Sequence, residues 1–435
     1  MSIARRPRRG WRPRAGAAVA LPAVLVAMLV LTPVAFVLWQ AAAIGWHEAV
    51  RLLIRPRVGT LLSNTLRLMA VVTVACGALG LGVAWVVERT DLPGRRVWAV
   101  LAALPITIPA FVAGYSWVSL TPAVEGFAGV ALIISLSYYP LVYLPVAAVL
   151  RGMDPSLEEA SRSLGRGAWS TFLSVTLPQT RPALFGGCLL VALHLLGEFG
   201  MFAMLRFPTF TTAIYDQYRL TFNGPAASML ASVLVLLCLL LLIVERRVRG
   251  GARYARLGAG AARAPRRFRL GRATPAALAA FTLLIGLALG VPLASLGYWL
   301  AIGDSAAFPL HGLLATAGAS LRLGLGAAGL TTLFAIPVSL LATRHRGRLA
   351  SAVERGSYLS MALPGLVVAL ALAVVAVRFV RPLDQTTSLL FLAYAILFLP
   401  FAVVAVRAAI AQVPQSLEEA ARSLGCGQAV ALVRV

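Results

Sequence analysis

Long runs of apolar residues, separated by short polar or basic segments, make up most of this chain. Ten of the runs can cross the roughly 30 Å hydrocarbon layer of a bilayer as an α-helix that rises about 1.5 Å per residue. They lie at residues 19–39, 66–87, 97–120, 130–150, 183–205, 226–244, 275–300, 313–342, 358–377 and 387–406. The pattern predicts an all-α integral membrane protein with six spans followed by four.

Six arginines precede the first run, as basic residues do in secretory signal peptides. The run is longer than the apolar core of a signal peptide, and no persuasive small-residue cleavage site precedes Trp39. We therefore interpret it as a retained first span that follows a basic cytoplasmic tail at residues 1–16.

A nine-residue polar segment occurs twice in the chain. Its copies at residues 157–165 and 417–425 differ at one position, where Ser161 stands against Ala421. Each copy follows an apolar run, so each is expected to be a loop at the end of a span. The sequence therefore predicts two copies of one membrane unit.

Further correspondences extend this repeat along the chain. At offsets of about 255 to 260 residues, the matching pairs are Pro140 with Pro400, residues 65–68 with 320–323, and Leu104-Pro105 with Leu363-Pro364. Both polar loops fall on the same side of the membrane in this arrangement. The two units then form a parallel repeat about an axis along the membrane normal.

The repeat also gives the expected domain boundaries. Residues 17–245 form the first unit, with six spans and a polar loop at 151–181, and residues 246–273 form an arginine- and glycine-rich cytoplasmic linker. Residues 274–435 form the second unit, with four spans and an incomplete loop at 407–435. Since the last residue corresponds to a position inside the first loop, we expect the chain to be a piece of a longer gene product with two further spans.

The formal net charge of +24 bears on topology and not on nucleic-acid binding. A nucleic-acid-binding protein gathers basic and aromatic residues on one soluble face, whereas the arginines here lie between the spans. With a cytoplasmic N-terminus, the clusters at 89–96, 246–272 and 344–355 all fall on the cytoplasmic side, as the positive-inside rule expects. The arginines at 51–57 would lie outside, and we interpret that stretch as an amphipathic surface segment.

Few residues suggest a metal or solute site. The four cysteines form no CxxC pair, so neither a zinc site nor a disulfide framework is expected. His194 and Glu198 lie four residues apart, on one face of the fifth predicted span. They are candidates for a translocation path, but Glu198 equally suits an interfacial carboxylate. Two ligands are too few to hold an iron ion firmly, so no metal site is expected.

The first polar loop has the physical features of a docking element. Ser156 is expected to cap a short helix, with Glu158 and Glu159 in its first turn, where carboxylates favour the positive helix end. Gly165 is expected to end the helix by adopting a left-handed backbone. An ordinary amphipathic interfacial loop is the alternative to a docking element.

The spacing within the loop carries a family resemblance. Glu159-Ala160-Ser161 is followed after three residues by Gly165 and, beyond a further nine residues, by Val175 and then Leu177-Pro178. This spacing resembles the EAA signature of the membrane subunits of bacterial ATP-binding-cassette importers. The second copy keeps the same pattern as far as the chain extends, with Glu419, Ala420, Ala421, Gly425 and Val435.

The tandem arrangement points to one branch of that family. Residues 89–96 and 196–200, together with two fused units, resemble the ferric-iron importer permeases. The resemblance implies two six-helix type I permease units, the second truncated after four helices, in the bacterial inner membrane. It implies a binding-protein-dependent importer, with ferric iron as the first expected solute and thiamine, a phosphonate or a polyamine as alternatives.

The resemblance also implies partners and a coupling role for both loops. ABC ATPase subunits, two in number, would dock at the loops beneath the membrane, and a periplasmic substrate-binding protein would deliver the solute. The expected coupling residues are Glu158, Glu159, Ala160, Gly165, Leu177, Pro178, Glu418, Glu419, Ala420 and Gly425. No nucleic-acid partner is implied.

The chain itself is expected to perform no covalent chemistry and to bind no cofactor. It contains no lysine, so it lacks the P-loop that cradles ATP phosphates, and ATP would be hydrolysed by a separate chain. The rival from another class is a secondary transporter driven by an ion gradient. Such a protein needs charged residues near the middle of the membrane and broken helices, and it would leave the repeated loop unexplained.

Overall fold

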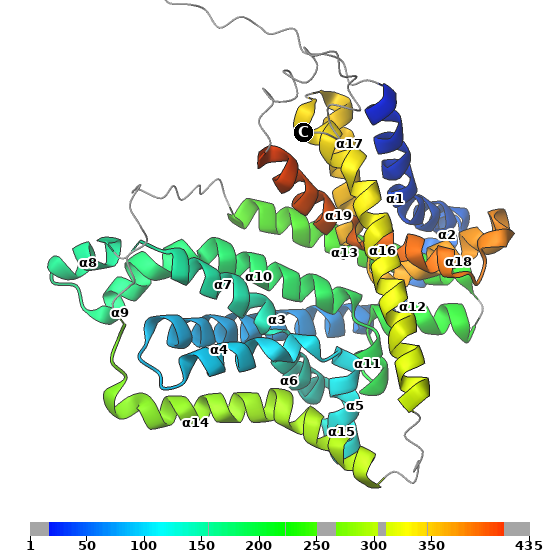
Figure 1. Ribbon diagram of the computed structural model, residues 1–435. Helices are drawn as coiled ribbons and strands as arrows, with labels where there is room; N and C mark the ends of the chain where they lie inside the picture. Colours follow the sequence, from blue (N-terminus) through cyan, green and yellow to red (C-terminus); the bar gives the residue numbers. More distant parts are fainter. Residues whose placement is uncertain are drawn as a thin grey trace, which may run out of the picture. The chain divides into compact units, whose positions relative to one another are not determined.

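The computed structural model describes residues 17–154, 156–221, 223–249, 267–302, 310–345 and 347–412, and these residues are mainly helical (Figure 1). Eight of their helices are long and apolar enough to cross a membrane, which confirms the prediction of an all-α membrane protein. They are Val19–Ala43, Pro56–Arg89, Phe127–Gly152, Trp169–Gly197, Gly224–Val244, Gly271–Ile302, His311–Arg344 and Thr387–Arg407. The predicted basic tail and the second polar loop, with Glu418, Glu419, Ala420 and Gly425, lie outside the described residues.

The helices form two compact units that group the spans differently from the sequence repeat. The larger unit comprises Gln40–Ala307, and the smaller unit comprises Met1–Trp39 with Phe308–Val435. The first span of the second half therefore belongs to the larger unit, and most of the first span of the first half belongs to the smaller one. The domain boundaries taken from the repeat stay a prediction.

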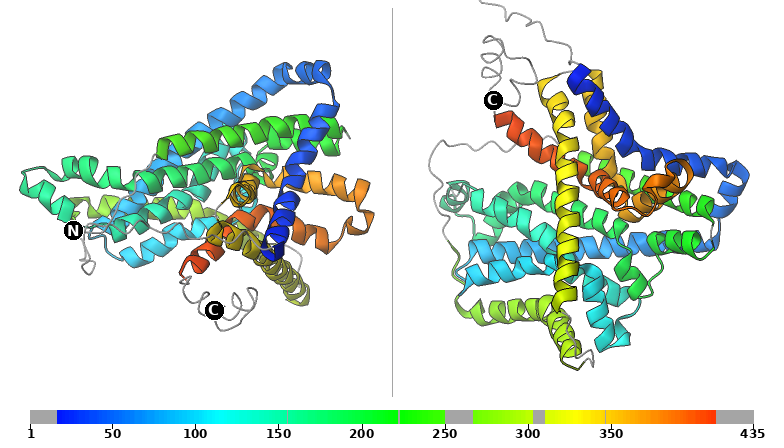
Figure 2. Two further views of the ribbon diagram at one scale, coloured as in Figure 1. Left: turned by 90° about the horizontal axis from the view of Figure 1, so that it is seen from above. Right: turned by 45° about the vertical axis from the view of Figure 1, so that its right-hand side comes forward.

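Three helices pack closely at the centre of the larger unit (Figures 1 and 2). They are α3 (Pro56–Arg89), α7 (Pro140–Gly152) and α10 (Leu177–Gly197). Two glycines allow the close approach, because a Cβ atom at Gly80 would lie 2.6 Å from the Cβ of Val142, and one at Gly187 would lie 2.7 Å from the Cα of Val142. Small residues at helix contacts are typical of membrane proteins, where helices gain little from the hydrophobic effect.

The first span of the second half lies against the first half's helices. It consists of α14 (Thr274–Ile285), a π turn at Gly286–Gly290, and α15 (Val291–Ile302). The ring of Phe281 on α14 packs edge-on against Trp98 at 5.7 Å, and the hydroxyls of Ser295 and Ser119 are 2.9 Å apart. The predicted span at 275–300 is thus confirmed, inside the larger unit.

The predicted span at 97–120 is not one continuous helix. It consists of α4 (Arg95–Ala103), a 3-10 turn at Leu104–Thr107, and α5 (Ala110–Leu120), with a bend of 92°. Pro109 is the N-cap of α5, and Ile108 before it is extended. Proline disfavours helical backbone at the preceding residue and has no N–H to donate, so the helix ends there.

The second half is interrupted in the same way. The predicted span at 358–377 contains a 3-10 turn at Leu359–Ala362 and then α18 (Gly365–Phe379), with Pro364 as its N-cap. Pro364 therefore corresponds to Pro109, and the sequence pairing of Pro364 with Pro105 is wrong. The helix α5 has 11 residues and α18 has 15. This difference in length accounts for most of the increase in the repeat offset, from 255 residues at Pro109 and Pro364 to 260 at Pro140 and Pro400.

The fifth predicted span has different bounds from those expected at 183–205. The apolar helix runs over Trp169–Gly197 and stops there. After a break come α11 (Gly200–Met204), α12 (Phe210–Arg219) and α13 (Gly224–Arg249).

The expected amphipathic stretch at 51–57 includes the end of the short helix α2 (Trp46–Leu53).

The smaller unit is organised around α16 (Leu310–Arg344) and α19 (Thr387–Gln412). The Ser339 hydroxyl donates to the carbonyl of Val403 at 3.2 Å and joins the two helices. The unit also contains α17 (Arg348–Tyr358), which is joined to α19 by an ion pair between Glu354 and Arg407. The helix α1 (Ala17–Ala43) starts in this unit.

Candidate functional site

The first polar loop contains the short helix that its sequence predicts, α8 (Ser156–Ser163). Gly165 has φ of +79°, in the left-handed region, as expected for the residue that ends the helix. Its N–H donates to the carbonyl of Arg162 at 2.9 Å, and the N–H of Arg166 donates to the carbonyl of Ser161 at 3.3 Å. These two hydrogen bonds form a Schellman motif, so the predicted role of Gly165 in the backbone is confirmed.

The start of α8 differs slightly from the prediction. Ser156 is the first helical residue and not the cap, and its N–H donates to the Asp154 Oδ1 at 3.0 Å. A short acidic side chain before a helix satisfies one of the N–H groups that the first turn leaves without a partner. Asp154 thus supplies the acceptor that the sequence analysis assigned to Ser156.

Glu158 points into the protein and fixes the loop to the end of α3. Its carboxylate lies 3.2 Å from one terminal nitrogen of Arg89, and the other nitrogen donates to it at 3.4 Å. The Thr176 hydroxyl donates to the same carboxylate at 2.7 Å. Both Glu158 and Arg89 are buried, so if one of them were removed, water could not readily stabilise the charge of the other. Removing one partner of such a pair is strongly destabilising.

Glu159 and Ala160 are exposed, in contrast to Glu158. Four large apolar side chains are exposed around them: Leu157, Leu164, Trp169 and Leu173, with Leu164 80% and Trp169 70% exposed. Exposed apolar groups rimmed by polar residues are typical of a surface that binds another protein or a membrane. The loop thus has one anchored side, held by Glu158, and one free side that includes Glu159.

The Leu177-Pro178 pair lies where the loop returns to the membrane. Leu177 is the first residue of α10, and a π turn at Phe172–Thr176 directly precedes it. Both residues of the pair are half-buried. The neighbouring Thr176 makes the hydrogen bond to Glu158, so the end of the motif is connected to its start.

The two residues that hold Glu158, Arg89 and Thr176, were not predictable from local sequence patterns. The sequence placed Arg89 in a basic cluster and in the segment 89–96 that resembles the ferric-iron permeases, but indicated no contact with Glu158, and Thr176 stood out in no pattern. Glu158 is 69 residues from Arg89 and 18 from Thr176, so no local periodicity could have shown these contacts. A buried carboxylate in a polar loop was the one signal that a partner should exist, and it requires knowledge of burial.

His194 and Glu198 make no hydrogen bond or ion pair with each other, but both contact Tyr138 of α6 (Phe127–Tyr138). The Tyr138 hydroxyl donates to Glu198 at 2.6 Å, and the Tyr138 ring meets the His194 ring edge-on at 5.8 Å. Glu198 lies in the break between α10 and α11, and its carboxylate also accepts from the Met201 N–H at 3.0 Å. These contacts show Glu198 holding the break together, and its role in a path stays a prediction.

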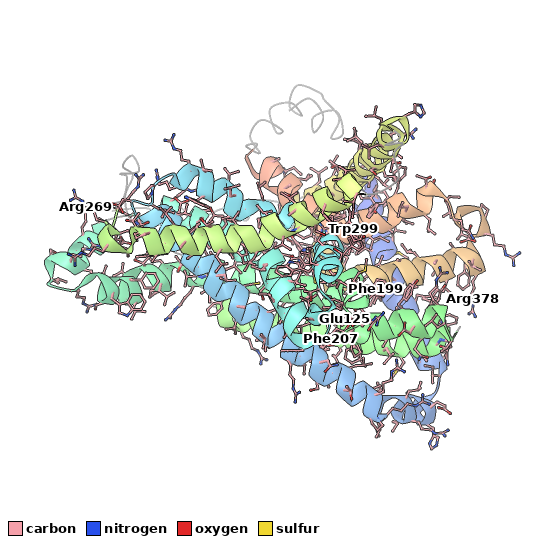
Figure 3. All side chains as sticks on the ribbon, turned by 90° about the horizontal axis from the view of Figure 1, so that it is seen from below. Glu125, Phe199, Phe207, Arg269, Trp299 and Arg378 are labelled. Atoms are coloured by element: carbon pink, nitrogen blue, oxygen red, sulfur yellow. The ribbon has the colours of Figure 1, made fainter. Side chains whose placement is uncertain are left out.

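The break between α10 and α11 lies toward one end of the larger unit, and the segment that packs beside the first polar loop lies toward the other end (Figure 3). In Figure 3, Phe199, directly after Glu198, lies near Glu125 and Phe207, whereas Arg269 lies at the far end. The Phe199 ring packs on Tyr215 of α12 at 4.6 Å. Among the described residues, no group of three His, Cys, Asp or Glu side chains is placed to hold a metal ion.

Comparison with known proteins gives a family match in two segments. Residues 77–254 and 335–435 match the family described as binding-protein-dependent transport system inner membrane component. Each segment lies largely in one of the two predicted units, which confirms the tandem arrangement.

Several curated transport proteins are similar to this chain. The Fe(3+)-transport system permease protein FbpB 2 of Haemophilus influenzae is 38% identical over 407 residues, which cover 92% of this chain and 80% of that protein. The sulfate transport system permease protein CysT of Escherichia coli is 32% identical over 240 residues, 50% of this chain and 86% of that protein. The molybdenum transport system permease protein ModB of Escherichia coli is 31% identical over 138 residues, 28% of this chain and 60% of that protein.

Proposed function

This chain belongs to the binding-protein-dependent transport system inner membrane components, and from that premise we propose that it is the permease subunit of a ferric-iron importer. Its membership makes it a multi-pass inner-membrane permease of an ABC importer. This class decides against the ion-gradient-driven secondary transporter. The identity of the solute, the docking sites and the orientation are the parts that we propose.

The extent of the similarity supports ferric iron as the proposed solute. The Fe(3+) permease is similar along 92% of this chain, whereas the sulfate permease is similar along 50% of it. A single alignment that covers both predicted units supports descent from one tandem protein. Thiamine, phosphonate and polyamine remain alternatives, and the similar sulfate and molybdenum permeases add two oxyanions.

We further propose that an ATPase subunit docks on the free side of α8. The Glu158 anchor makes α8 move with the end of α3, so that a push on Glu159 and its apolar neighbours would move the long helix. ATP-driven closure of two such subunits would then switch the permease between inward-open and outward-open states as rigid bodies. ATP would be used by those subunits, and no cofactor is assigned to this chain.

The proposed orientation places the N-terminus, the Arg95 turn and the loop at Arg166 in the cytoplasm. The structure brings the end of α3, the start of α4 and α8 to the same end of the larger unit, as Figure 1 shows. That proximity supports a common side for these segments. A second ATPase subunit would use the loop at 417–425, which lies outside the described residues.

Uptake into proteoliposomes tests the proposed solute. The full importer would be reconstituted with its ATPase and binding protein, and uptake of radiolabelled ferric iron, sulfate, molybdate, thiamine, a phosphonate and a polyamine would be compared. We expect ATP-dependent accumulation of ferric iron alone. ATP-dependent uptake of another of these solutes, with none of iron, would show that the proposed solute is wrong while leaving the permease class intact.

A further inference from the structure

The segment that enters the second half is bound to the first half next to α8. The Phe268 N–H donates to the carbonyl of Arg89 at 2.8 Å, and the Asp91 N–H donates to the carbonyl of Phe268 at 3.1 Å. These bonds form an isolated parallel bridge between Phe268 and Thr90. The Leu270 N–H adds a third bond, to the Asp91 Oδ1 at 2.8 Å.

The Phe268 side chain then links α3 to α8. Its ring lies 5.7 Å from the Trp85 ring of α3, and the Arg162 guanidinium of α8 lies 4.4 Å above its centre. A guanidinium at this distance is attracted by the electron-rich face of the ring. Arg162 makes no ion pair within the described part of the chain, and its guanidinium contacts the Phe268 ring instead.

The same segment continues directly into the membrane. Leu270 is followed by a 3-10 turn at Gly271–Ala273 and by α14, which packs on the first half through Phe281 and Trp98. Contacts therefore connect α8 to α3 through Glu158 and to the start of α14 through Phe268, so that a displacement of α8 would act on both. The first transmission was expected of a coupling loop, but the second has no counterpart in the sequence motif.

We propose that Phe268 is a positioning residue of the first coupling loop, which orients α8 through Arg162 and joins α8 to the first span of the second half. The inference rests on the proposed docking of an ATPase at α8 and adds a connection to that site. It explains why an aromatic residue stands at the point where the linker ends. A flexible linker alone would need neither a ring there nor two main-chain hydrogen bonds and a third to the Asp91 side chain.

Substitutions at Phe268 separate a positioning role from a merely structural one. Phe268→Leu keeps an apolar side chain but removes the ring face, whereas Phe268→Tyr keeps the ring. In the complete importer in proteoliposomes, we expect Phe268→Leu to lower solute uptake per ATP hydrolysed by about threefold, the size expected for a lost cation–π contact. Phe268→Tyr should restore the ratio to that of the unaltered protein, and both variants should copurify with the ATPase.

Arg162 supplies the reciprocal test. Arg162→Gln should also lower the ratio of uptake to hydrolysis. The double variant should be no worse than Phe268→Leu, because both changes remove the same cation–π contact and only Phe268→Leu also removes the ring contact with Trp85. Equal ratios for Phe268→Leu, Phe268→Tyr and the unaltered protein would overturn the inference alone. Failure of the unaltered chain to bind any ATPase would overturn both the inference and the proposed docking.

Discussion

The two long helices α3 and α16 occupy equivalent places in the sequence repeat but have different surroundings. In the larger unit, α10 covers one face of α3, where a Cβ atom at Gly77 would meet the Cys188 Sγ at 3.2 Å. In the smaller unit, the equivalent Thr332 lines an open groove of about 470 Å³ between α16 and α19. Among the described residues, this helix position is therefore packed against α10 in the larger unit and lines a groove in the smaller one.

Aromatic side chains of α19, on the other side of the groove, show the same difference between the two units. Phe398 and Phe401 of α19 are 53% and 51% exposed, and Phe398 is equivalent to Tyr138 at an offset of 260 residues. In the larger unit, Tyr138 is covered by the contacts of its hydroxyl with Glu198 and of its ring with His194. The repeat specifies the paired helices, and the spans that pack on them decide which face is buried.

The largest effect is expected where α3 meets the loop. Arg89→Met would leave the buried Glu158 carboxylate without its counter-charge, at about 3–5 kcal/mol of unfolding free energy. The double variant Arg89→Met, Glu158→Leu should recover most of that loss, because neither charge then remains. Thermal unfolding of the purified protein in detergent measures both. Equal instability of the single and double variants would show that the pair does not act as a unit.

The equivalent end of α16 sharpens the comparison. The repeat places Arg344 at the position of Arg89, at an offset of 255 residues, and Glu418 at the position of Glu158, at an offset of 260. Glu418 lies outside the described residues. We predict that Arg344→Met is also destabilising and that Glu418→Leu partly compensates for it, with a loss of about 2–4 kcal/mol because Arg344 is less buried. The same unfolding measurement applies. If Glu418→Leu did not compensate, the equivalence of α3 and α16 would extend only over the membrane-spanning part of these helices.

A smaller effect is expected at the faces that differ. Gly77→Val would force a side chain against Cys188 and should lower the unfolding free energy by about 1–3 kcal/mol. At the equivalent position, Thr332→Val keeps nearly the same volume and faces the groove, so its effect should stay within about 0.5 kcal/mol. A loss at Thr332 as large as that at Gly77 would show that the Thr332 hydroxyl, which donates to the Ala328 carbonyl at 2.8 Å, matters as much as the packing at Gly77.

The same contrast shows what the sequence alone could predict. Apolar runs identified the spans, since a helix in a bilayer must satisfy its own backbone and present apolar side chains. The left-handed Gly165 was predictable because the requirement is local. The bend at Pro109 was missed because average hydropathy takes no account of a missing N–H. The partners of Glu158 and Glu198 were missed because they lie far away in the chain.

On the free side of α8, we expect a modest effect on stability and a specific effect on transport. Glu159 is exposed, so Glu159→Ala should lower the helix stability by only about 0.3–1 kcal/mol, through the loss of a charge at the positive helix end. Gly165→Val should add about 1–2 kcal/mol of local strain, because a residue with a Cβ atom disfavours the left-handed backbone. We expect the double variant to insert and unfold nearly normally, yet to bind the ATPase weakly or to hydrolyse ATP without solute uptake. Copurification, ATP hydrolysis and uptake in the reconstituted importer measure these together.

The matched variant in the second loop completes this last comparison. Glu419→Ala with Gly425→Val changes the equivalent positions, and if each loop engages one ATPase subunit, the two double variants should reduce uptake by similar factors. Combining all four substitutions should then abolish uptake, because neither half could follow its ATPase. Normal uptake in the first double variant would show that the loop held by Glu158 is not the coupling element, whatever the second loop does. A loss confined to the first loop would instead show that the two halves, alike in their helices, are coupled differently to ATP hydrolysis.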